Sequence, residues 1–454
     1  MLKINPGIFR EYDIRGIVDE DLNEEIVRTI GKAFGSYLRE HEKKTVSIGR
    51  DCRESSPAYS DAFAAGLNSC GINVLDLGMV STPILYYSLF NLEVQGGVMI
   101  TASHNPSEYN GIKLCVGNES LFGEQIQQIR ILAEKQEFPN GMGKTECVDI
   151  INQYQYFMHK NINIKPGLKV AVDCGNGMGG LLGPKIIRDH GCEVFELFSN
   201  PDGRFPNHHP DPTVEKNLTD LIKTVKDNHL DIGMGFDGDA DRIGVVNEKG
   251  EIIWGDMILL MLARDVLSEV PGAEIIGDVK CSGRLFKDIE KNGGKPLMWK
   301  TGHSLIKSKM KSDGAQLAGE MSGHIFFAHR FFGYDDALYA GLRLLEILSK
   351  SGGRVSELLL DVPHAISTPE IRVDCPDQIK FKVVDDVKLK LSEKYKVNGI
   401  DGARIEFPDG WGLIRASNTQ PALVMRFEAE NNERLTEIKK LIEENLESSI
   451  KSLS

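Results

Sequence analysis

The stretch GGVMITASHNPSEYNGIKL, residues 96–114, indicates the fold and a site of chemistry. Its first half is small and apolar, which predicts a buried strand over residues 96–102. That strand runs directly into Thr-Ala-Ser-His-Asn-Pro, whose Asn-Pro pair is typical of a turn. A turn explains the Asn-Pro pair but leaves Ser103, at the strand end, and Lys113, ten residues later, without a structural reason.

Helices and strands alternate along the sequence on both sides of this stretch. Helical periodicity over residues 23–40 and 56–71 alternates with strand-like runs over 45–51 and 72–78. Strand–helix–strand order predicts right-handed units and a mostly parallel sheet. The alternation resumes at residue 169 and again near residue 255. From about Pro363 several strand-like runs follow one another, and an amphipathic helix closes the chain.

We therefore expect an α/β protein with three similar domains on mixed or parallel sheets, plus a C-terminal α+β domain. The expected domain boundaries are 1–148, 149–250, 251–364 and 365–454. In each α/β domain an apolar strand ends in a polar loop, in VMITASHNP, GMGFDGDADR and AQLAGEMSGH. Ligands of open parallel sheets bind beyond the carboxyl ends of strands. Three such loops predict one central cleft, which the fourth domain closes.

Composition excludes several classes of protein. At 454 residues the chain is too long for a single core, and its net charge of −13 argues against a nucleic-acid partner. The longest apolar run, residues 257–263, is too short to span a bilayer, and no secretory signal opens the sequence. The eight cysteines form no C-x-x-C pair. We expect reduced thiols and a cytoplasmic location, with no membrane partner.

The run DGDADR places Asp237, Asp239 and Asp241 in alternation. Three carboxylates this close at a strand end repel one another unless a cation lies between them. Oxygen ligands of this kind favour Mg²⁺ or Ca²⁺. An EF-hand loop is a poor match, because Arg242 stands where that loop needs glycine. A solvated acidic turn is the bland alternative, and we favour the metal site.

A second motif competes for the interpretation. CGNGMGG sets Gly175, Gly177 and Gly180 in the G-x-G-x-x-G spacing of a dinucleotide-binding turn, and Glu196 follows where a ribose-binding acid would stand. A turn that lets a strand and a helix pack closely is the alternative. A nicotinamide enzyme, a phosphatase acting through Ser103 and a silent sugar-phosphate sensor are therefore rival functions.

Two later loops carry groups suited to a sugar phosphate. GEMSGH offers a carboxylate, a hydroxyl and an imidazole, which suit sugar hydroxyls. These groups belong to Glu320, Ser322 and His324. RASNTQP offers a guanidinium, hydroxyls and backbone N–H groups, which suit a phosphate. Its candidate residues are Arg415, Ser417, Asn418 and Thr419.

Taken in order, FREYDIRG, TASHNP, DGDADR, GEMSGH and RASNTQP resemble the α-D-phosphohexomutase family, above all its bacterial phosphomannomutase/phosphoglucomutase branch. The resemblance covers residues 9–428. It implies interconversion of hexose 1-phosphate and 6-phosphate, with mannose or glucose as the sugar. Mg²⁺ would be the cofactor, and a hexose 1,6-bisphosphate the intermediate and activator. Phosphoglucosamine mutase is the alternative within the family, in which CGNGMGG is a structural turn.

The resemblance also implies roles for the loop residues. Ser103 would carry the transferable phosphate, and Asp237, Asp239 and Asp241 would bind Mg²⁺ together with that phosphate. Arg15 and Lys113 would lie beside the phosphoserine, with Lys113 a candidate for proton transfer. Arg242 would lie next to the metal ligands, and His324 would be a second acid/base candidate.

On the cleft wall, Tyr12, Lys280 and His303 would contact the substrate, while Glu320 and Ser322 would read the O3 and O4 hydroxyls of the sugar. The RASNTQP residues named above would clamp the distal phosphate. Gln420 departs from a family pattern that often has threonine. We expect a hinge near residues 363–369 that moves the last domain, and a monomer or small homo-oligomer.

Overall fold

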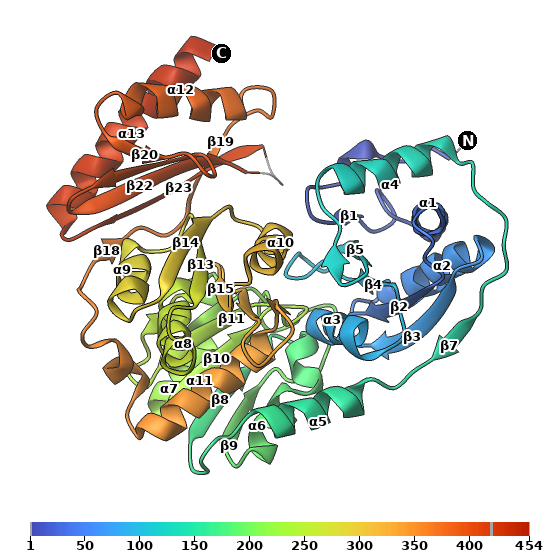
Figure 1. Cartoon of the computed structure of the whole chain (residues 1–454), viewed down its shortest axis with the longest axis horizontal. Coiled ribbons are helices and arrows are strands. Elements are labelled where there is room, and N and C mark those ends of the chain that lie inside the picture. Colours follow the sequence, from blue (N-terminus) through green and yellow to red (C-terminus); the bar gives the residue numbers. More distant parts are fainter. Residues whose placement is uncertain (1, 418–420, 454) are drawn as a thin grey trace.

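The computed structural model describes residues 2–417 and 421–453, and its four sheets follow one another along the chain (Figure 1). The first sheet has the strand order β1-β5-β4-β2-β3-β7, with β6 beside β5. Its strands are β1 Ile14–Ile17, β2 Thr45–Arg50, β3 Asn73–Met79, β4 Gly96–Ile100, β5 Tyr109–Val116, β6 Glu119–Ser120 and β7 Thr145–Cys147. Its helices are α1 Glu24–Glu40, α2 Ser56–Ser69, α3 Thr82–Asn91 and α4 Glu124–Lys135.

The second and third sheets have the orders β12-β11-β10-β8-β9 and β14-β13-β15-β16-β17. The elements around the second are α5 Ile151–Asn161, β8 Lys169–Asp173, α6 Gly183–Asp189, β9 Glu193–Leu197, α7 Thr219–Asp227, β10 Ile232–Phe236, β11 Ile243–Asn247 and β12 Ile252–Ile253. Those around the third are α8 Gly255–Glu269, β13 Glu274–Asp278, α9 Gly283–Lys291, β14 Lys295–Trp299, α10 His303–Asp313, β15 Leu317–Gly319, β16 Ile325–Phe327, β17 Tyr334–Asp335 and α11 Ala337–Ser351.

These three sheets share one topology. Three neighbouring strands are parallel, and the last of the three along the chain is followed by an antiparallel strand that lies beside it. The prediction of three similar mixed-sheet α/β domains is confirmed. Each antiparallel return creates one connecting loop at the strand end. We call them the serine loop (residues 101–108), the aspartate loop (237–242) and the glutamate loop (320–324).

The fourth sheet is antiparallel and is covered by two helices, as the α+β pattern predicts. Its elements are β18 Ile366–Ser367, β19 Ile371–Asp374, α12 Lys380–Ser392, β20 Lys396–Asn398, β21 Ala403–Phe407, β22 Gly410–Ala416, β23 Ala422–Ala429 and α13 Asn432–Leu453. It docks on the third domain through Arg404, whose guanidinium stacks on Trp411 at 3.8 Å. Nη1 of Arg404 donates to the carbonyl oxygens of Val279 and Cys281 at 2.7 and 2.6 Å.

Local signals set the helix ends. The side chain of Asn23 accepts from the backbone N–H of Ile26 and so caps α1. Asp336 caps α11 in the same way, through the N–H of Tyr339, and Gly352 ends that helix in the left-handed region at φ 64°. Side-chain caps satisfy N–H groups that have no partner within the helix, and glycine adopts positive φ without strain.

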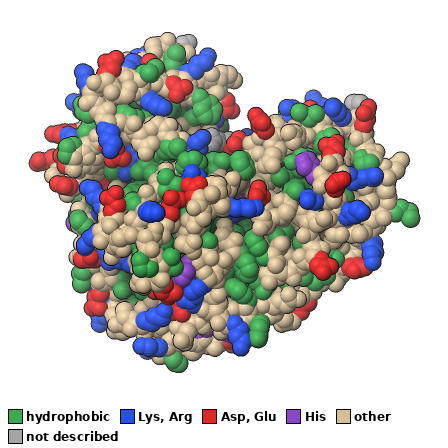
Figure 2. Space-filling model, in the orientation of Figure 1, with side chains coloured by type: hydrophobic (Ala, Val, Ile, Leu, Met, Phe, Trp, Pro, Cys, Tyr) green, Lys and Arg blue, Asp and Glu red, His purple; other side chains and the backbone are tan. Residues whose placement is uncertain are grey.

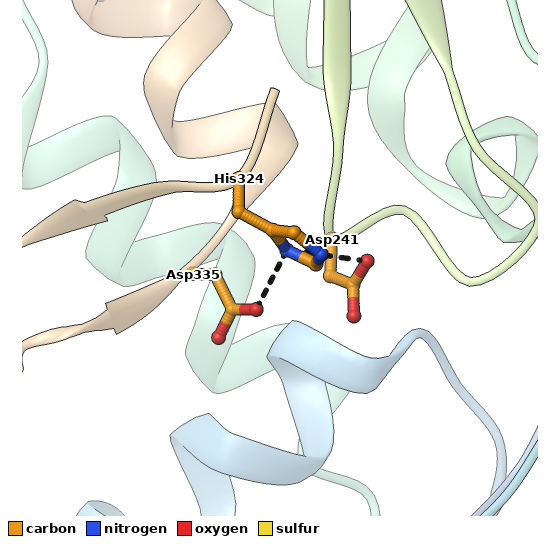
Figure 3. Close-up of side chains that lie close together, drawn as sticks. All are labelled: Asp241, His324 and Asp335. Atoms are coloured by element: carbon orange, nitrogen blue, oxygen red, sulfur yellow. Dashed lines mark ion pairs between the residues drawn. The ribbon is translucent and has the colours of Figure 1, made fainter. Parts of the chain in front are cut away.

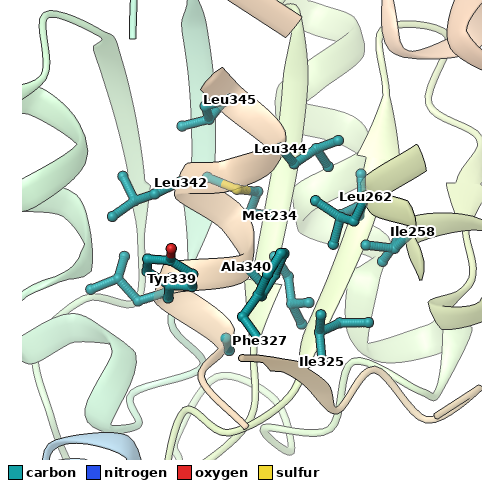
Figure 4. Packing of buried hydrophobic residues seen from close by; sticks show 14 of the residues in the cluster. Met234, Ile258, Leu262, Ile325, Phe327, Tyr339, Ala340, Leu342, Leu344 and Leu345 are labelled. Atoms are coloured by element: carbon teal, nitrogen blue, oxygen red, sulfur yellow. The ribbon is translucent and has the colours of Figure 1, made fainter. Parts of the chain in front are cut away.

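One apolar core joins the second and third domains (Figure 4) and extends to buried residues of β3, α3, β4 and β5 in the first. Helix α11 contacts α8 and β16 of its own domain and β11 of the second domain. At Gly341 an added Cβ would lie 2.9 Å from Sδ of Met234 and 3.3 Å from Cδ1 of Ile243, so the glycine lets this helix approach the second sheet closely. In the part of the chain that is described, no helix is both long and apolar enough to cross a membrane.

The position of α11 makes a stability prediction. Leu344 is fully buried in this shared core. Replacing it with alanine removes buried surface and leaves a cavity, which typically costs about 2–5 kcal/mol. We expect Leu344→Ala to lower the urea midpoint of the unfolding transition of the second and third domains. The helical control Leu389→Ala, at a side chain 68% exposed on α12, should leave every midpoint in place. Equal shifts in both variants would contradict the shared core.

Candidate active site

Contacts between domains bring the three loops together. The Ser103 hydroxyl of the serine loop donates to Oδ2 of Asp237 in the aspartate loop at 2.9 Å. Nε of Arg242 in the aspartate loop donates to Nε2 of His324 in the glutamate loop, also at 2.9 Å. Figure 2 shows the surface hollowed between the C-terminal and N-terminal domains. The strand-end rule thus placed these loops correctly relative to one another.

Ser103 lies in the left-handed region, at φ 51°, and is buried. A residue other than glycine is strained there, and such strain is typical of functional turns. Its backbone N–H donates to Oγ1 of Thr101 at 2.9 Å, and Oγ lies 3.1 Å from Nδ1 of His104. The aspartate loop packs directly on this turn, since a Cβ added at Gly238 would lie 2.2 Å from the Ser103 carbonyl oxygen.

Asp237, Asp239 and Asp241 are fully buried, and one oxygen of each lies within 4.8 Å of the others. Burial raises the pKa of Asp237 well above its ordinary value, and the carboxylates of Asp241 and Asp239 raise it further. Oδ1 of Asp239 and Oδ1 of Asp241 have no hydrogen-bond partner. Buried oxygens left open in this way fit a divalent cation, for which carboxylates are the preferred ligands.

Lys113 reaches into this triad from β5. Its Nζ donates to Oδ2 of Asp239 at 2.8 Å and to Oδ2 of Asp241 at 2.6 Å. Burial alone would lower the pKa of Lys113, but the two carboxylates outweigh it and hold that pKa well above its ordinary value. Lys113 therefore bonds the Oδ2 atom of each of these two carboxylates, and the Oδ1 atom of each stays open.

A second cluster orients His324 (Figure 3). Its Nδ1 lies 2.9 Å from Oδ2 of Asp335 and 3.6 Å from Oδ1 of Asp241. Because Arg242 donates to Nε2, that nitrogen is the acceptor, and in the neutral ring Nδ1 carries the proton. Lys307 lies 3.2 Å from Oδ1 of Asp335 and helps to hold the pKa of that carboxyl well below its ordinary value, against the effect of burial.

The predicted sugar-reading residues lie around this imidazole. Glu320 is buried, accepts from the backbone N–H of Gly302 at 2.6 Å and lies 4.0 Å from His324. Burial raises the pKa of Glu320. His303 stacks on His324 with ring centroids 5.6 Å apart and meets the edge of Tyr12 at 5.8 Å. Burial lowers the pKa of His303 well below its ordinary value. Ser322 is half-buried in the same glutamate loop.

Three predicted cationic residues point to separate parts of the site. Arg15 donates from Nη1 to Oδ1 of Asn105 in the serine loop at 2.6 Å. Nζ of Lys280 lies 3.4 Å from Oε2 of Glu370. Arg415 donates from Nε to Asp401 at 3.0 Å. Ser417 is buried beyond the end of β22, whereas Asn418, Thr419 and Gln420 lie outside the described residues.

Sequence reasoning missed several residues that hold these loops. Thr82 donates from Oγ1 to Oδ2 of Asp239 at 2.5 Å. It follows β3, so the strand-end rule could have found it. Asp335 stands directly before Asp336, and the pair reads as an ordinary helix cap. Arg53 donates to the serine loop from outside every quoted motif, and nothing in its sequence context marks it.

The glycines of CGNGMGG are packed against the protein itself. A Cβ at Gly177 would lie 2.8 Å from the carbonyl oxygen of Gly238, and one at Gly180 would lie 1.9 Å from that of Ser199. The Glu196 carboxylate is already engaged within the protein, because it accepts hydrogen bonds from Arg188 and Ser199 at 2.5 and 2.6 Å. The motif is therefore a close-packed turn that supports the aspartate loop, as its structural interpretation predicts.

Comparison with known proteins finds four family models that follow one another along most of the chain. Models of phosphoglucomutase/phosphomannomutase α/β/α domains I, II and III match residues 6–140, 149–250 and 254–366, and the C-terminal domain model matches 370–445. The phosphomannomutase/phosphoglucomutase of Pseudomonas aeruginosa is 47% identical over 448 residues, 98% of this chain and 97% of that protein.

Other matches agree. A crystal structure of a phosphoglucomutase/phosphomannomutase family protein from Burkholderia thailandensis has a TM-score of 0.94 and 41% identity, covering 100% of this chain and 99% of that one. A probable phosphoglucosamine mutase of Methanopyrus kandleri is more distant, at 35% identity over 95% of this chain and 96% of that protein. The chain therefore belongs to the phosphoglucomutase/phosphomannomutase family and is a phosphohexomutase, an isomerase that moves phosphate within a hexose phosphate.

Proposed function

We propose that this phosphohexomutase interconverts the 1- and 6-phosphates of glucose and mannose through a phosphoryl group carried on Ser103. The carrying observation is the Ser103 hydroxyl, buried and 2.9 Å from Asp237 beside the acidic triad. High identity to a phosphomannomutase/phosphoglucomutase supports the two sugars, and the lower identity to the phosphoglucosamine mutase makes amino sugars the second choice.

Asp237, Asp239 and Asp241 are the residues that would hold Mg²⁺, together with the Ser103 phosphate. The open Oδ1 atoms of Asp239 and Asp241 and the raised pKa of Asp237 support this assignment. When bound, the ion supplies positive charge for the oxygens of the transferring phosphoryl group.

The reaction consists of two phosphoryl transfers, one from Ser103 and one back to it. A sugar hydroxyl, O1 or O6, attacks the phosphorus on Ser103, so that a new O–P bond forms and the Oγ–P bond breaks. The sugar hydroxyl proton passes to a base, and the departing Oγ takes up a proton to become the serine hydroxyl again. The hexose 1,6-bisphosphate then turns over in the cleft. In the second half-reaction its other phosphoryl group returns to Ser103, and a 1-phosphate has become a 6-phosphate.

Lys113 and His324 divide the charge and proton roles. The raised pKa of Lys113 keeps it an ammonium, which suits stabilisation of the phosphoryl oxygens and not proton abstraction. His324 would be the base once Arg242 leaves its Nε2, because the Nε2 lone pair accepts from Arg242 in this structure and Nδ1 faces Asp335. Arg15 contacts the serine loop and Arg242 belongs to the aspartate loop, so both would place positive charge near the phosphoryl group.

The cleft wall would hold the sugar and the second phosphate. Glu320 would accept hydrogen bonds from the sugar hydroxyls, and Ser322 would donate to or accept from them. Tyr12, Lys280 and His303 would surround the sugar. Arg415, Ser417, Asn418 and Thr419 would clamp the distal phosphate. Asp401 accepts both from Arg415 and from the Thr301 N–H, which links the fourth domain to the third across the cleft.

We also propose the domain division 1–148, 149–250, 251–364 and 365–454, with a hinge near residues 363–369 that lets the last domain open while the bisphosphate turns. The oligomeric state, monomer or small homo-oligomer, stays a prediction. Eight free cysteine thiols support a cytoplasmic location for the enzyme.

The substrate assignment is tested by turnover. With Mg²⁺ and a trace of glucose 1,6-bisphosphate, we expect comparable kcat/KM on glucose 1-phosphate and mannose 1-phosphate, and lower kcat/KM on glucosamine 1-phosphate. Ser103→Ala should reduce kcat by at least about 10⁴-fold, because the phosphoryl carrier is gone. Net release of inorganic phosphate would instead identify a phosphatase. Wild-type-like turnover by Ser103→Ala would refute the phosphoserine.

The acidic triad makes a prediction about stability and metal. Because burial raises the folded-state pKa of Asp237 above its unfolded value, the ionised carboxylate destabilises the metal-free fold above that unfolded value, including at pH 7. We expect Asp237→Asn to melt at a higher temperature than wild type in EDTA at pH 7. A gain of about 1 kcal/mol corresponds to about 2–4 °C if the second and third domains, which share a core, unfold together.

Mg²⁺ should then raise the melting temperature of wild type more than that of Asp237→Asn, since an ion that binds only the folded state stabilises it. Activity should vanish in EDTA and in the variant. The exposed Asp385→Asn is the matched control and should behave as wild type. Equal responses of wild type and Asp237→Asn to Mg²⁺ would remove Asp237 from the metal site.

A further inference from the structure

Arg53 lies close to the serine loop, and the reaction steps proposed above give it no role. Every N–H donor of its guanidinium is nevertheless hydrogen-bonded. It stands just after β2, and its side chain has no exposed surface. All five of its N–H donors have acceptors. Nε donates to Asp51 at 3.2 Å, while the two amino groups donate to four backbone carbonyls at 2.6–2.9 Å. Those carbonyls belong to Ser103, Asn105, Pro106 and Tyr109.

The four acceptors span the serine loop from its nucleophile to the first residue of β5. A planar guanidinium has fixed donor directions, so one side chain sets the relative positions of four peptide groups. One of these is the carbonyl of Ser103, whose left-handed φ of 51° needs support from its surroundings. Asp51, itself buried, balances the charge of Arg53 and also accepts from its backbone N–H at 3.0 Å.

The second domain covers the Arg53 guanidinium from the side opposite the serine loop. The Phe205 ring lies 5.1 Å from the Arg53 guanidinium carbon, a distance within the range of a cation–π contact. A Cβ at Gly203 would lie 2.4 Å from the Arg53 Cα, so only glycine lets the segment after β9 lie directly on Arg53. The same segment reaches the aspartate loop, because Pro210 Cγ would lie 3.5 Å from a Cβ at Gly238.

We propose that Arg53 is a positioning residue that holds Ser103 in the orientation needed for phosphoryl transfer, with Phe205 as its cover. The inference rests on the phosphoserine function proposed above. All five guanidinium donors of Arg53 are used by acceptors of the protein itself, so none is left for the sugar or the transferring group. Its loss should slow transfer to and from Ser103 while leaving the affinity for hexose phosphate unchanged. A displacement of about 1 Å in a reacting group costs about 100-fold in rate.

The test compares Arg53→Lys with the matched control Arg50→Lys. Lysine keeps the charge but has three donors on one atom and cannot reach four carbonyls. Arg50 lies on the same strand, half-buried, and pairs only loosely with Asp76 at 3.6 Å. The measurements are kcat and KM on glucose 1-phosphate, the rate of Ser103 phosphorylation by glucose 1,6-bisphosphate from intact mass, and the urea midpoint.

For Arg53→Lys we expect kcat about 100-fold lower, an unchanged KM and a Ser103 phosphorylation rate that falls by the same factor. Arg50→Lys should match wild type in all of these. If kcat per folded Arg53→Lys molecule equals that of wild type, or if KM rises while the phosphorylation rate is kept, the positioning role is overturned. An inactive wild type would instead overturn the proposed function.

Phe205→Leu provides a second route should Arg53→Lys fail to fold. Leucine keeps the apolar cover but removes the ring face that meets the guanidinium. We expect a smaller loss of kcat than for Arg53→Lys, again at unchanged KM and with a matching loss in Ser103 phosphorylation. Wild-type kcat in Phe205→Leu, together with an Arg53→Lys that does not fold, would reduce Arg53 to a purely structural residue and overturn the proposal.

Discussion

The burial of three carboxylates at a junction between domains is the constraint on which this site depends. Asp237, Asp239 and Asp241 lie out of water, and their repulsion must be balanced by positive charge. Lys113 balances part of it from the first domain, at 2.8 and 2.6 Å. The remaining open oxygens favour a cation. The electrostatic balance of the second domain is therefore completed by its neighbour, which ties the two together.

A repeated topology explains why such different chemistry meets in one place. Each α/β domain ends its parallel run in a hairpin, and each hairpin contributes one loop: a hydroxyl, a set of carboxylates, then a carboxylate with an imidazole. Loops on paired strands are held at both ends. The groups are consequently positioned by sheets and not by long mobile segments, which suits a reaction that depends on placing a phosphoryl group accurately.

The fold class and the family membership could both be predicted from sequence patterns. Periodicity predicted the helices and parallel strands, and five motifs in one order carried the family resemblance. The antiparallel returns were harder to anticipate, because residues 109–116 carry a site lysine within a short apolar run. Thr82 and Asp335 were missed since each also has an ordinary explanation, the first turn of a helix and an acid beside a cap. Arg53 was missed since four of its five acceptors are backbone carbonyls, which no side-chain motif records.

The sequence by itself determined which groups are present and at which strand ends they stand, because strand periodicity and loop composition are local properties. Only the tertiary structure decided which of them meet. That Lys113 lies between Asp239 and Asp241, that Arg242 fixes the tautomer of His324 and that Arg53 spans four carbonyls all depend on contacts between segments far apart in the chain. Such contacts arise from the packing of whole domains, and a short stretch of residues contains no record of them.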